Sequence, residues 1–285
     1  MTDEKHFGAR LARAVTDRGP LCVGIDPHPG LLDAWELSQD AAGVERFGRT
    51  VVEALGDRVA VLKPQSAFYE RYGSRGIAAL ERTIADARAA GALVIADVKR
   101  GDIGSTVAGY AAAYLDPASP LCSDALTASP YLGVGALAPL VAVAQAHGNG
   151  VFILALTSNP EGAQVQRAVT ADGRTVAQAV LDAVGELNVG YTPYGPIGVV
   201  VGATLGDTGH DLSRLNGPFL APGLGAQGGT AESLRTVFGA GRATVLPSVS
   251  REVLRAGPDV AALRAAAAGA VSAFRAALAV RPAST

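Results

Sequence analysis

Three charged residues that could carry out acid–base chemistry follow one apolar run of the sequence. The run, residues 92–96, is continuous and contains β-branched side chains, which is typical of a strand covered on both faces. Asp97, Lys99 and Asp102 come directly after it. Because side chains alternate along a strand, Asp97 and Lys99 point to the same side, and the flanking carboxylates favour the charged form of the lysine. Such an ammonium could stabilise a developing anion and then donate a proton to it.

Charged residues in a surface loop can also form a solvated ion pair that contributes little. The position of this group favours a functional site instead. In α/β proteins, ligands bind at the C-terminal ends of parallel strands. The flanking glycines, Gly101 and Gly104, loosen the backbone at that end.

Other apolar runs also end on polar side chains. Asp26, Lys63, Ser158, Gln227 and Arg251 each lie at or just after the end of such a run. A turn or a solvated side chain would explain any one of them. Because all parallel strands of a barrel end on the same side, the whole set predicts a single polar site at one mouth of the molecule.

The last two strand ends suit a phosphate group. The stretch after residue 217 contains Pro222 and Gln227 among closely spaced glycines, whose backbone N–H groups can approach an anion. Ser250 and Arg251 end the last apolar run, and a guanidinium can bind a phosphate through two hydrogen bonds. In (β/α)₈ barrels, phosphate sites usually lie after the seventh and eighth strands.

The elements that must position these residues alternate along the chain. Short apolar runs are separated by segments with the periodicity of amphipathic helices. Strands are expected at 21–26, 58–68, 92–96, 124–129, 150–160, 196–204, 217–229 and 242–251. Helices are expected at 6–18, 40–55, 74–90, 104–115, 136–146, 174–187, 212–215, 231–238 and 259–278.

Eight strands that alternate with helices predict a (β/α)₈ barrel, and 285 residues suit its typical length of about 250. A doubly wound open sheet is the alternative, but no run carries the charges or prolines that protect an edge strand. No linker or change of composition divides the chain. Residues 1–285 are therefore expected to form one domain, in which a short N-terminal helix precedes the first strand.

Composition argues against several other classes of protein. Lys and Arg total 24 against 26 Asp and Glu, a net charge of −2, which is unlike a nucleic-acid-binding face. The four histidines show no metal-ligand spacing, and Cys22 and Cys122 are expected to be buried free thiols. No uninterrupted apolar segment is long enough to span a bilayer, and no signal peptide is visible. A soluble cytoplasmic protein that binds neither metal nor membrane is expected.

Several of these stretches also match the motifs of one enzyme family. The D-x-K-x-x-D-I run from Asp97 to Ile103, followed by Thr106, resembles the active-site signature of orotidine 5'-phosphate decarboxylases. Related sugar-phosphate aldolases share the D-x-K-x-x-D part. The resemblance extends along nearly the whole chain through the VLKPQ, TSNP and APGLGAQGG stretches, and it is strongest to the bacterial subgroup with a longer chain. Many members have Gly-Arg after the eighth strand, where this chain has Ser250 before Arg251.

The resemblance implies a decarboxylase that converts orotidine 5'-phosphate to UMP without a metal or an organic cofactor. It implies that Lys99 stabilises a carbanion at C6 of the substrate and protonates it, with Asp97 beside the departing carboxylate. Lys63 would hold Asp97 and reach the ribose, and Asp26 would bind the ribose hydroxyls.

The resemblance also assigns the residues that bind the substrate. Ser158 and Gln227 would contact the pyrimidine edge or bridge to the phosphate, and Arg251 would hold the phosphate. The full set is Asp26, Ile103, Thr106, Ser158, Pro222, Gln227, Ser250 and Arg251. The family is dimeric. The resemblance therefore implies a homodimer in which Asp102, Ile103 and Thr106 complete the site of the partner subunit.

Two other functions fit the same residues. One is a phosphate-binding barrel aldolase, in which Lys99 forms a Schiff base or the carboxylates hold Mg²⁺. A Schiff base needs a neutral lysine, which flanking carboxylates disfavour. The other is a non-catalytic nucleotide-binding barrel, which would bind UMP without turning over orotidine 5'-phosphate.

Overall fold

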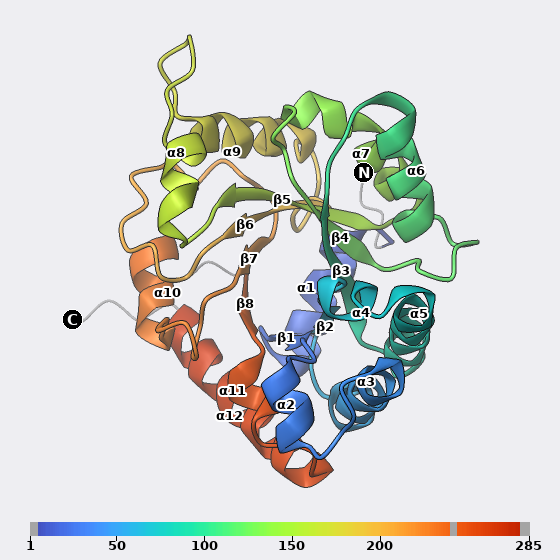
Figure 1. The fold of residues 1–285 in the computed structure, drawn as a ribbon. Coiled ribbons are helices and arrows are strands. Elements are labelled where there is room, and N and C mark those ends of the chain that lie inside the picture. Colours follow the sequence, from blue (N-terminus) through green and yellow to red (C-terminus); the bar gives the residue numbers. More distant parts are fainter. Residues whose placement is uncertain (1–4, 240–243, 280–285) are drawn as a thin grey trace, which may run out of the picture.

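Eight parallel strands form a closed barrel, which Figure 1 shows along its axis. The computed structural model describes residues 5–239 and 244–279. Each strand pairs with the next along the chain, and β8 pairs with β1, which confirms the predicted barrel and excludes the open sheet. The strands are β1 (Cys22–Ile25), β2 (Val61–Pro64), β3 (Leu93–Arg100), β4 (Ala125–Ala128), β5 (Gly150–Leu156), β6 (Ile197–Val201), β7 (Phe219–Ala221) and β8 (Val245–Val249). Residues 242–243 of the last expected strand lie outside the described ranges.

Amphipathic helices surround the barrel (Figure 1). In one of them, Asp40 accepts the backbone N–H of Gly43 at 2.8 Å to begin the helix, and Val44, Phe47 and Val51 are buried along one face. The α-helices are α1 (Phe7–Arg18), α2 (Pro29–Ala34), α3 (Ala41–Leu55), α4 (Ala67–Glu70), α5 (Gly73–Ala89), α6 (Gly104–Leu115), α7 (Ala138–His147), α8 (Ala163–Gln166), α9 (Val176–Leu187), α10 (Ala231–Phe238), α11 (Arg251–Leu254) and α12 (Val260–Leu278). Two 3₁₀ turns complete the set, η1 (Val134–Leu137) and η2 (Pro160–Gly162).

The helix expected at 212–215 is absent, so this prediction is wrong. Ser213 donates its backbone N–H to Oδ1 of Asp211 at 2.8 Å, and Asp211 donates its own N–H to Oε1 of Gln178 at 2.9 Å. These bonds hold the segment in turns, because short polar side chains compete with helical hydrogen bonding. The sequence pattern also does not predict α2, α4, α8 and α11, which are too short to show helical periodicity.

Side chains that point into the barrel form two layers. Because strand side chains alternate, residues two positions apart on a strand both point inward, one layer above the other. The lower layer is apolar and buried and includes Cys22, Val61, Ile95, Ala125, Phe152 and Leu246. Two positions further along four of these strands, the upper layer is polar, with Lys63, Asp97, Thr127 and Ser248. The polar groups therefore lie on an apolar floor.

Helix α1 closes the barrel beneath this floor. Phe7 and Leu11 belong to the same buried cluster as the lower layer. The Phe7 ring meets the Phe152 ring edge-to-face, with centroids 5.8 Å apart. A Cβ atom on Gly150 would lie 2.5 Å from the Phe7 ring, so only glycine fits at this position of β5.

Asp124 ties α1 to the barrel. Its buried carboxylate pairs with Arg10 and accepts the backbone N–H of Val94 at 2.9 Å. We expect Asp124→Ala to lower the free energy of unfolding by about 3 kcal/mol, the low end for a broken buried ion pair because the Arg10 side chain is 24% exposed. Urea unfolding measures this loss. Glu45→Ala, which removes an exposed pair with Arg82, is the control and should lower the free energy of unfolding much less. Equal losses in the two variants would contradict a stabilising role of the Asp124–Arg10 pair.

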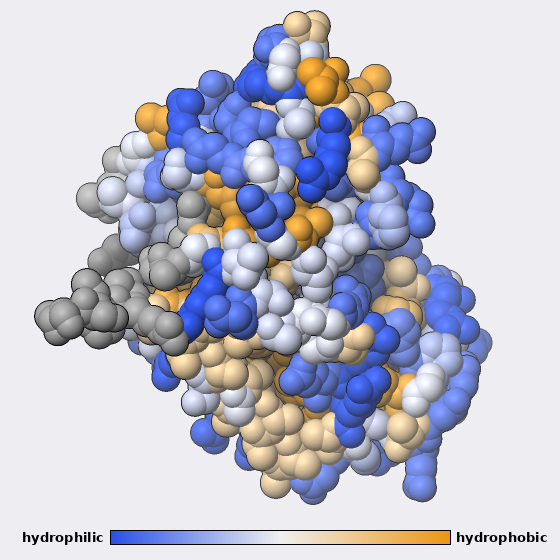
Figure 2. All heavy atoms as spheres, turned by 90° about the vertical axis from the view of Figure 1, so that its left-hand side faces the viewer, coloured by the Kyte–Doolittle hydropathy of each residue, from blue (hydrophilic) through white to orange (hydrophobic). Residues whose placement is uncertain are grey.

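One helix, α12, is long and apolar enough to cross a membrane by length and composition, with a mean hydropathy of 1.3. Arg264 and Arg275 interrupt this helix, so it is not the uninterrupted apolar segment that was expected to be absent. In the structure α12 packs as an outer helix of the barrel: Leu263 and Phe274 are buried, and Arg264 donates to the carbonyl of Ala54 at 3.0 Å. Figure 2 shows the side of the molecule that lies on the left in Figure 1. A broad, weakly hydrophobic area lies low on this side, at the height of α12 in Figure 1.

Both cysteines are buried free thiols, as expected. Burial raises the pKa of the Cys22 thiol to about 12. Because the thiolate is the reactive form, Cys22 is an inert part of the apolar floor at neutral pH.

Candidate active site

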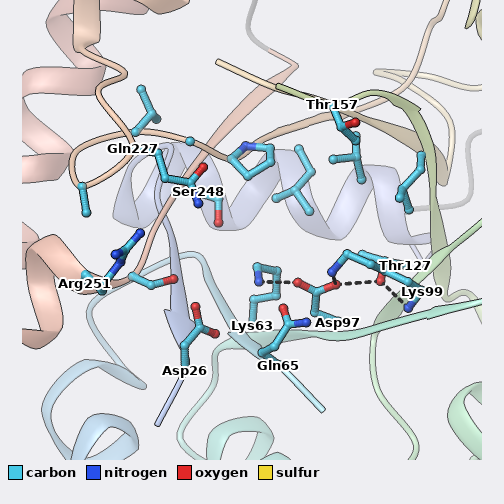
Figure 3. Close-up of a pocket in the computed structure, with 18 of the residues that line it drawn as sticks. Asp26, Lys63, Gln65, Asp97, Lys99, Thr127, Thr157, Gln227, Ser248 and Arg251 are labelled. Atoms are coloured by element: carbon cyan, nitrogen blue, oxygen red, sulfur yellow. Dashed lines mark hydrogen bonds and ion pairs between the residues drawn. The ribbon is translucent and has the colours of Figure 1, made fainter. Parts of the chain in front are cut away.

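A cavity of about 280 Å³ opens at the C-terminal ends of the strands, above the polar layer (Figure 3). Eight of the twelve residues predicted for the site line it. They are Asp26, Lys63, Asp97, Lys99, Pro222, Gln227, Ser250 and Arg251. The structure thus brings residues from five strand ends into one concave site, as parallel strands of a barrel require.

Asp97 lies at the centre of the charged end of the cavity. Its Oδ2 pairs with Lys63 Nζ at 2.7 Å, and its Oδ1 pairs with Lys99 Nζ at 2.6 Å and accepts the Thr127 hydroxyl at 2.9 Å. Burial by itself would raise the pKa of Asp97, but the charges of Lys63 and Lys99 outweigh burial and hold the pKa well below its ordinary value. The carboxylate is therefore ionised wherever the protein is folded at ordinary pH.

Lys63 is the buried partner of this carboxylate. Burial would lower the pKa of its ammonium, but the charges of Asp97 and Asp26 outweigh burial and raise the pKa well above its ordinary value. Lys63 therefore stays charged and satisfies one oxygen of Asp97, which leaves the other oxygen to Lys99 and Thr127.

The Lys63–Asp97 pair predicts how stability depends on pH. The lowered pKa of Asp97 stabilises the fold above its ordinary value of 3.8, and this contribution is lost as the pH falls further. The raised pKa of Lys63 stabilises the fold below its ordinary value of 10.5, and this contribution is lost as the pH rises further. We expect the difference in unfolding free energy between the wild type and Asp97→Asn to shrink as the pH falls below 3.8. Urea titrations across pH measure it; a difference that grows in acid would contradict the pairing.

The backbone of β3 is irregular where it carries Lys99. Its pairing with β4 shifts between Ala96 and Arg100, so β3 continues past the residue where a loop was expected to begin. Lys99 has φ = +46°, a left-handed conformation that costs a residue with a side chain about 1–2 kcal/mol. Strain of this kind persists only where the surroundings hold it, and it is common at functional sites.

Asp26 lines the cavity, and one of its two carboxylate oxygens is buried. Among the described residues, no group donates a hydrogen bond to its buried Oδ1. An unpaired buried oxygen of this kind costs free energy. Nearby, a Cβ atom on Gly24 would lie 2.0 Å from the Ser250 hydroxyl, so glycine is required where Ser250 reaches over β1.

The other end of the cavity is formed by the loops after β7 and β8. Figure 3 shows Gln227 and Arg251 there, across the cavity from Lys99. In the described part of the chain, Arg251 has no acidic partner, so its guanidinium is available to an anion. Gly223 and Gly225 have φ of +99° and +68°, which explains why this loop needs glycines.

Ser158 is exposed and does not line the cavity, contrary to expectation; its neighbour Thr157 does. The pairing of β5 with β6 shifts between Leu154 and Leu156, and such a shift moves the inward position by one residue. Gln166 holds Thr157 in place from α8. Its Oε1 accepts the Thr157 backbone N–H at 2.9 Å, and its Nε2 donates to Thr157 Oγ1 at 2.7 Å.

Asp102, Ile103 and Thr106 also lie outside the cavity of their own chain. Asp102 accepts the backbone N–H of Ile103 at 2.8 Å, and in the described residues Lys99 pairs with Asp97 alone. The structure therefore does not place Asp102 beside Lys99 within one subunit. Ile103 is 61% exposed.

Sequence reasoning missed several residues of the cavity wall. They are His28, Gln65, Thr127, Thr157 and Ser248. Gln65 lies two residues after the predicted Lys63, and Thr127 and Ser248 stand at the inward position two residues beyond an apolar one. Alternation along β4 and β8 could therefore have found the last two. The described residues contain no group of three or more His, Cys, Asp or Glu side chains that could hold a metal ion.

Several known proteins that are similar to this chain point to one family. The model of the orotidine 5'-phosphate decarboxylase / HUMPS family matches residues 19–266. A Salinispora arenicola protein named orotidine 5'-phosphate decarboxylase is 69% identical over 272 residues, which cover 95% of this chain and 98% of that protein. A Streptomyces coelicolor protein of the same name is 63% identical over 262 residues, which cover 92% and 94%. A crystal structure of a Streptomyces avermitilis protein assigned the same activity has a TM-score of 0.94 and 62% identity, over 96% of both chains. The chain belongs to the orotidine 5'-phosphate decarboxylase / HUMPS family.

Proposed function

We propose that Lys99 stabilises and protonates the C6 carbanion as this chain converts orotidine 5'-phosphate to UMP. The chain is a carboxy-lyase of pyrimidine synthesis, and this conversion is the last de novo step. The role of Lys99 is supported above all by its pairing with Asp97 at 2.6 Å in the mouth of the barrel. A fixed ammonium next to the reacting carbon is what a carbanion without an electron sink requires.

The proposed steps balance with one proton. The bond between C6 and the carboxylate breaks, carbon dioxide leaves uncharged, and the electron pair stays on C6. The Lys99 ammonium stabilises this pair and then transfers a proton to it, which forms the C6–H bond of UMP. The Lys99 side chain is 46% exposed, so solvent can return the proton. Asp97 keeps the ammonium in place, and Lys63 keeps Asp97 in place.

The rest of the cavity would bind the parts of the substrate that do not react. Asp26 would bind a ribose hydroxyl, and Arg251 would hold the phosphate at the far end. Gln227 and Pro222 border the same end. Binding energy collected there can be used to stabilise the transition state at C6.

The test of the proposed reaction is the absorbance change when purified protein meets orotidine 5'-phosphate in the presence of EDTA. Turnover to UMP under these conditions supports the proposal. Activity that disappears with EDTA would favour a metal-dependent enzyme of the aldolase type. Binding of UMP without turnover would favour a non-catalytic nucleotide-binding barrel.

Removing the guanidinium at the far end should weaken phosphate-bearing ligands selectively. We expect Arg251→Ala to weaken UMP binding by about 1.5–3 kcal/mol, the range for a hydrogen bond to a charged group, and to leave uridine binding unchanged. Calorimetric titration with both ligands measures this difference. Arg255→Ala, an exposed cation just beyond α11, is the control and should change neither. Equal losses for UMP and uridine would contradict a phosphate contact.

We also propose a homodimer in which each subunit completes the site of the other. Three large apolar side chains support this: Ile103 is 61%, Tyr131 78% and Leu132 53% exposed. They lie on the loops after β3 and β4, which touch where Ser129 donates its backbone N–H to the carbonyl of Arg100 at 2.8 Å. Exposed apolar groups gathered beside a site are typical of an interface.

We further propose that residues 1–285 form one domain that acts in the cytoplasm on its small-molecule substrate, without nucleic acid or membrane. The net charge of −2 supports the absence of a nucleic-acid-binding face. The packing of α12 against the barrel supports its role as a structural helix.

A further inference from the structure

Thr127 makes three hydrogen bonds with one hydroxyl group in the wall of the cavity. Its Oγ1 accepts the backbone N–H groups of Val98 at 3.0 Å and Lys99 at 2.9 Å, and it donates to Oδ1 of Asp97 at 2.9 Å. A hydroxyl has one proton and two lone pairs. Because both lone pairs are occupied, the proton has to point at Asp97. The residue is only 1% exposed, so water does not compete for these bonds.

These bonds lie where the ladder between β3 and β4 is interrupted. Ala96 is level with Leu126, and Arg100 is level with Ala128, so four steps along β3 span two steps along β4. Backbone groups in such a bulge lose their regular partners, and buried ones must find others. Thr127 is the residue of β4 that lies between the two levels, and its hydroxyl takes up both N–H groups.

We propose that Thr127 is a positioning residue that aims Lys99 at the reacting carbon, an inference that rests on the proposed function. Thr127 holds Lys99 at two places. It binds the backbone N–H of Lys99, whose φ of +46° needs support from its surroundings, and it orients the Asp97 carboxylate to which Lys99 Nζ is bonded. This hydroxyl thereby holds the Lys99 backbone directly and the Lys99 ammonium indirectly, through Asp97.

Thr127 acts through these two residues and does not contact the substrate by hydrogen bonding. Its single proton is committed to Asp97 and its lone pairs to the bulge, so no capacity is left for a ligand. Loss of the hydroxyl should therefore change the chemical step and leave ground-state binding nearly unchanged.

The test compares Thr127→Val with Thr127→Ser. Valine keeps the shape of threonine and removes the hydroxyl, whereas serine keeps the hydroxyl. We expect Thr127→Val to lower kcat for orotidine 5'-phosphate by about 100-fold, the effect of a small misplacement of a catalytic group, with KM and the Kd of UMP nearly unchanged. Thr127→Ser should recover most of kcat. If Thr127→Val does not fold, Thr127→Cys replaces it, because a thiol is a weak donor and acceptor of similar size.

Thr83→Val is the matched control. Thr83 is also fully buried, its hydroxyl donates to the carbonyl of Ala79 in α5, and it is not among the residues that line the cavity, so kcat should not change. A Thr127→Val enzyme with wild-type kcat would overturn the inference, as would equal losses in Thr127→Val and Thr127→Ser. A rise in KM with kcat unchanged would overturn it too, because it would mean direct binding. Failure of the wild type to turn over substrate would instead overturn the proposed function.

Discussion

Replacing Lys99 with alanine is expected to lower kcat for orotidine 5'-phosphate by about 10⁴-fold or more. The variant loses the proposed proton donor, worth about 10²–10⁴-fold, and the charge that stabilises the carbanion, worth about 10²–10³-fold. The fold should survive, because the Lys99 side chain is 46% exposed and Asp97 keeps its bonds to Lys63 and Thr127. The absorbance assay measures the loss, and circular dichroism melting measures the stability.

Two controls make this experiment decisive. Arg82→Ala removes an exposed cation on the outer face of α5 and should leave kcat unchanged. Binding of UMP to Lys99→Ala should persist, because the phosphate and ribose contacts proposed above lie elsewhere in the cavity. Residual turnover within about 100-fold of the wild type would remove Lys99 from the role of proton donor.

A mixture of two inactive variants is expected to recover activity. Lys99→Ala lacks the ammonium of its own site, and Asp102→Ala lacks the carboxylate that is proposed to reach the partner's site. In a mixed dimer, one site combines both losses, whereas the other contains both native residues. Random reassembly makes half of the dimers mixed, so about a quarter of all sites should be active. Steady-state assays of the reassembled mixture measure this recovery against each variant alone.

The control pairs Lys99→Ala with Asp97→Ala. Asp97 and Lys99 belong to the same subunit's site, since their side chains are bonded at 2.6 Å. Mixed dimers of these two variants have no intact site and should stay inactive. Differently tagged subunits allow the mixed dimers to be purified. No recovery in purified Lys99→Ala and Asp102→Ala dimers, or equal recovery in the control, would contradict shared sites.

Most of the barrel could be predicted because its helices and strands have distinct periods and clear ends. Helix α10 begins after Thr230, whose side chain accepts the backbone N–H of Ser233, and it ends at Gly239. Both ends match the prediction. The strand expected at 150–160 is too long, since the ladder stops at Leu156 and the next backbone N–H binds a side chain instead. Local side-chain bonds of this kind leave no periodic signal in a sequence.

The charged residues of the cavity could be predicted from the sequence, whereas the threonine that supports them could not. Carboxylates and lysines directly after an apolar run are unusual, so Asp97 and Lys99 stand out. Threonine is common in strands, so Thr127 does not stand out in the sequence. Its hydroxyl accepts backbone N–H groups of β3 only because β3 bulges opposite it. The misplacement of Ser158 has the same origin. A shift of register in β5 changes which side chain faces inward and leaves the sequence alternation looking regular.

Helix α1 closes one end of the barrel, so the cavity does not run through it. Phe7 and the apolar layer above it stop the interior below the charged groups. Carbon dioxide released over that floor has to escape through the same opening by which the nucleotide arrived, past the glycine-rich loop. Any segment that covers this opening during the reaction must therefore lift before either product can depart, which couples the exit of the gas to the exit of the nucleotide.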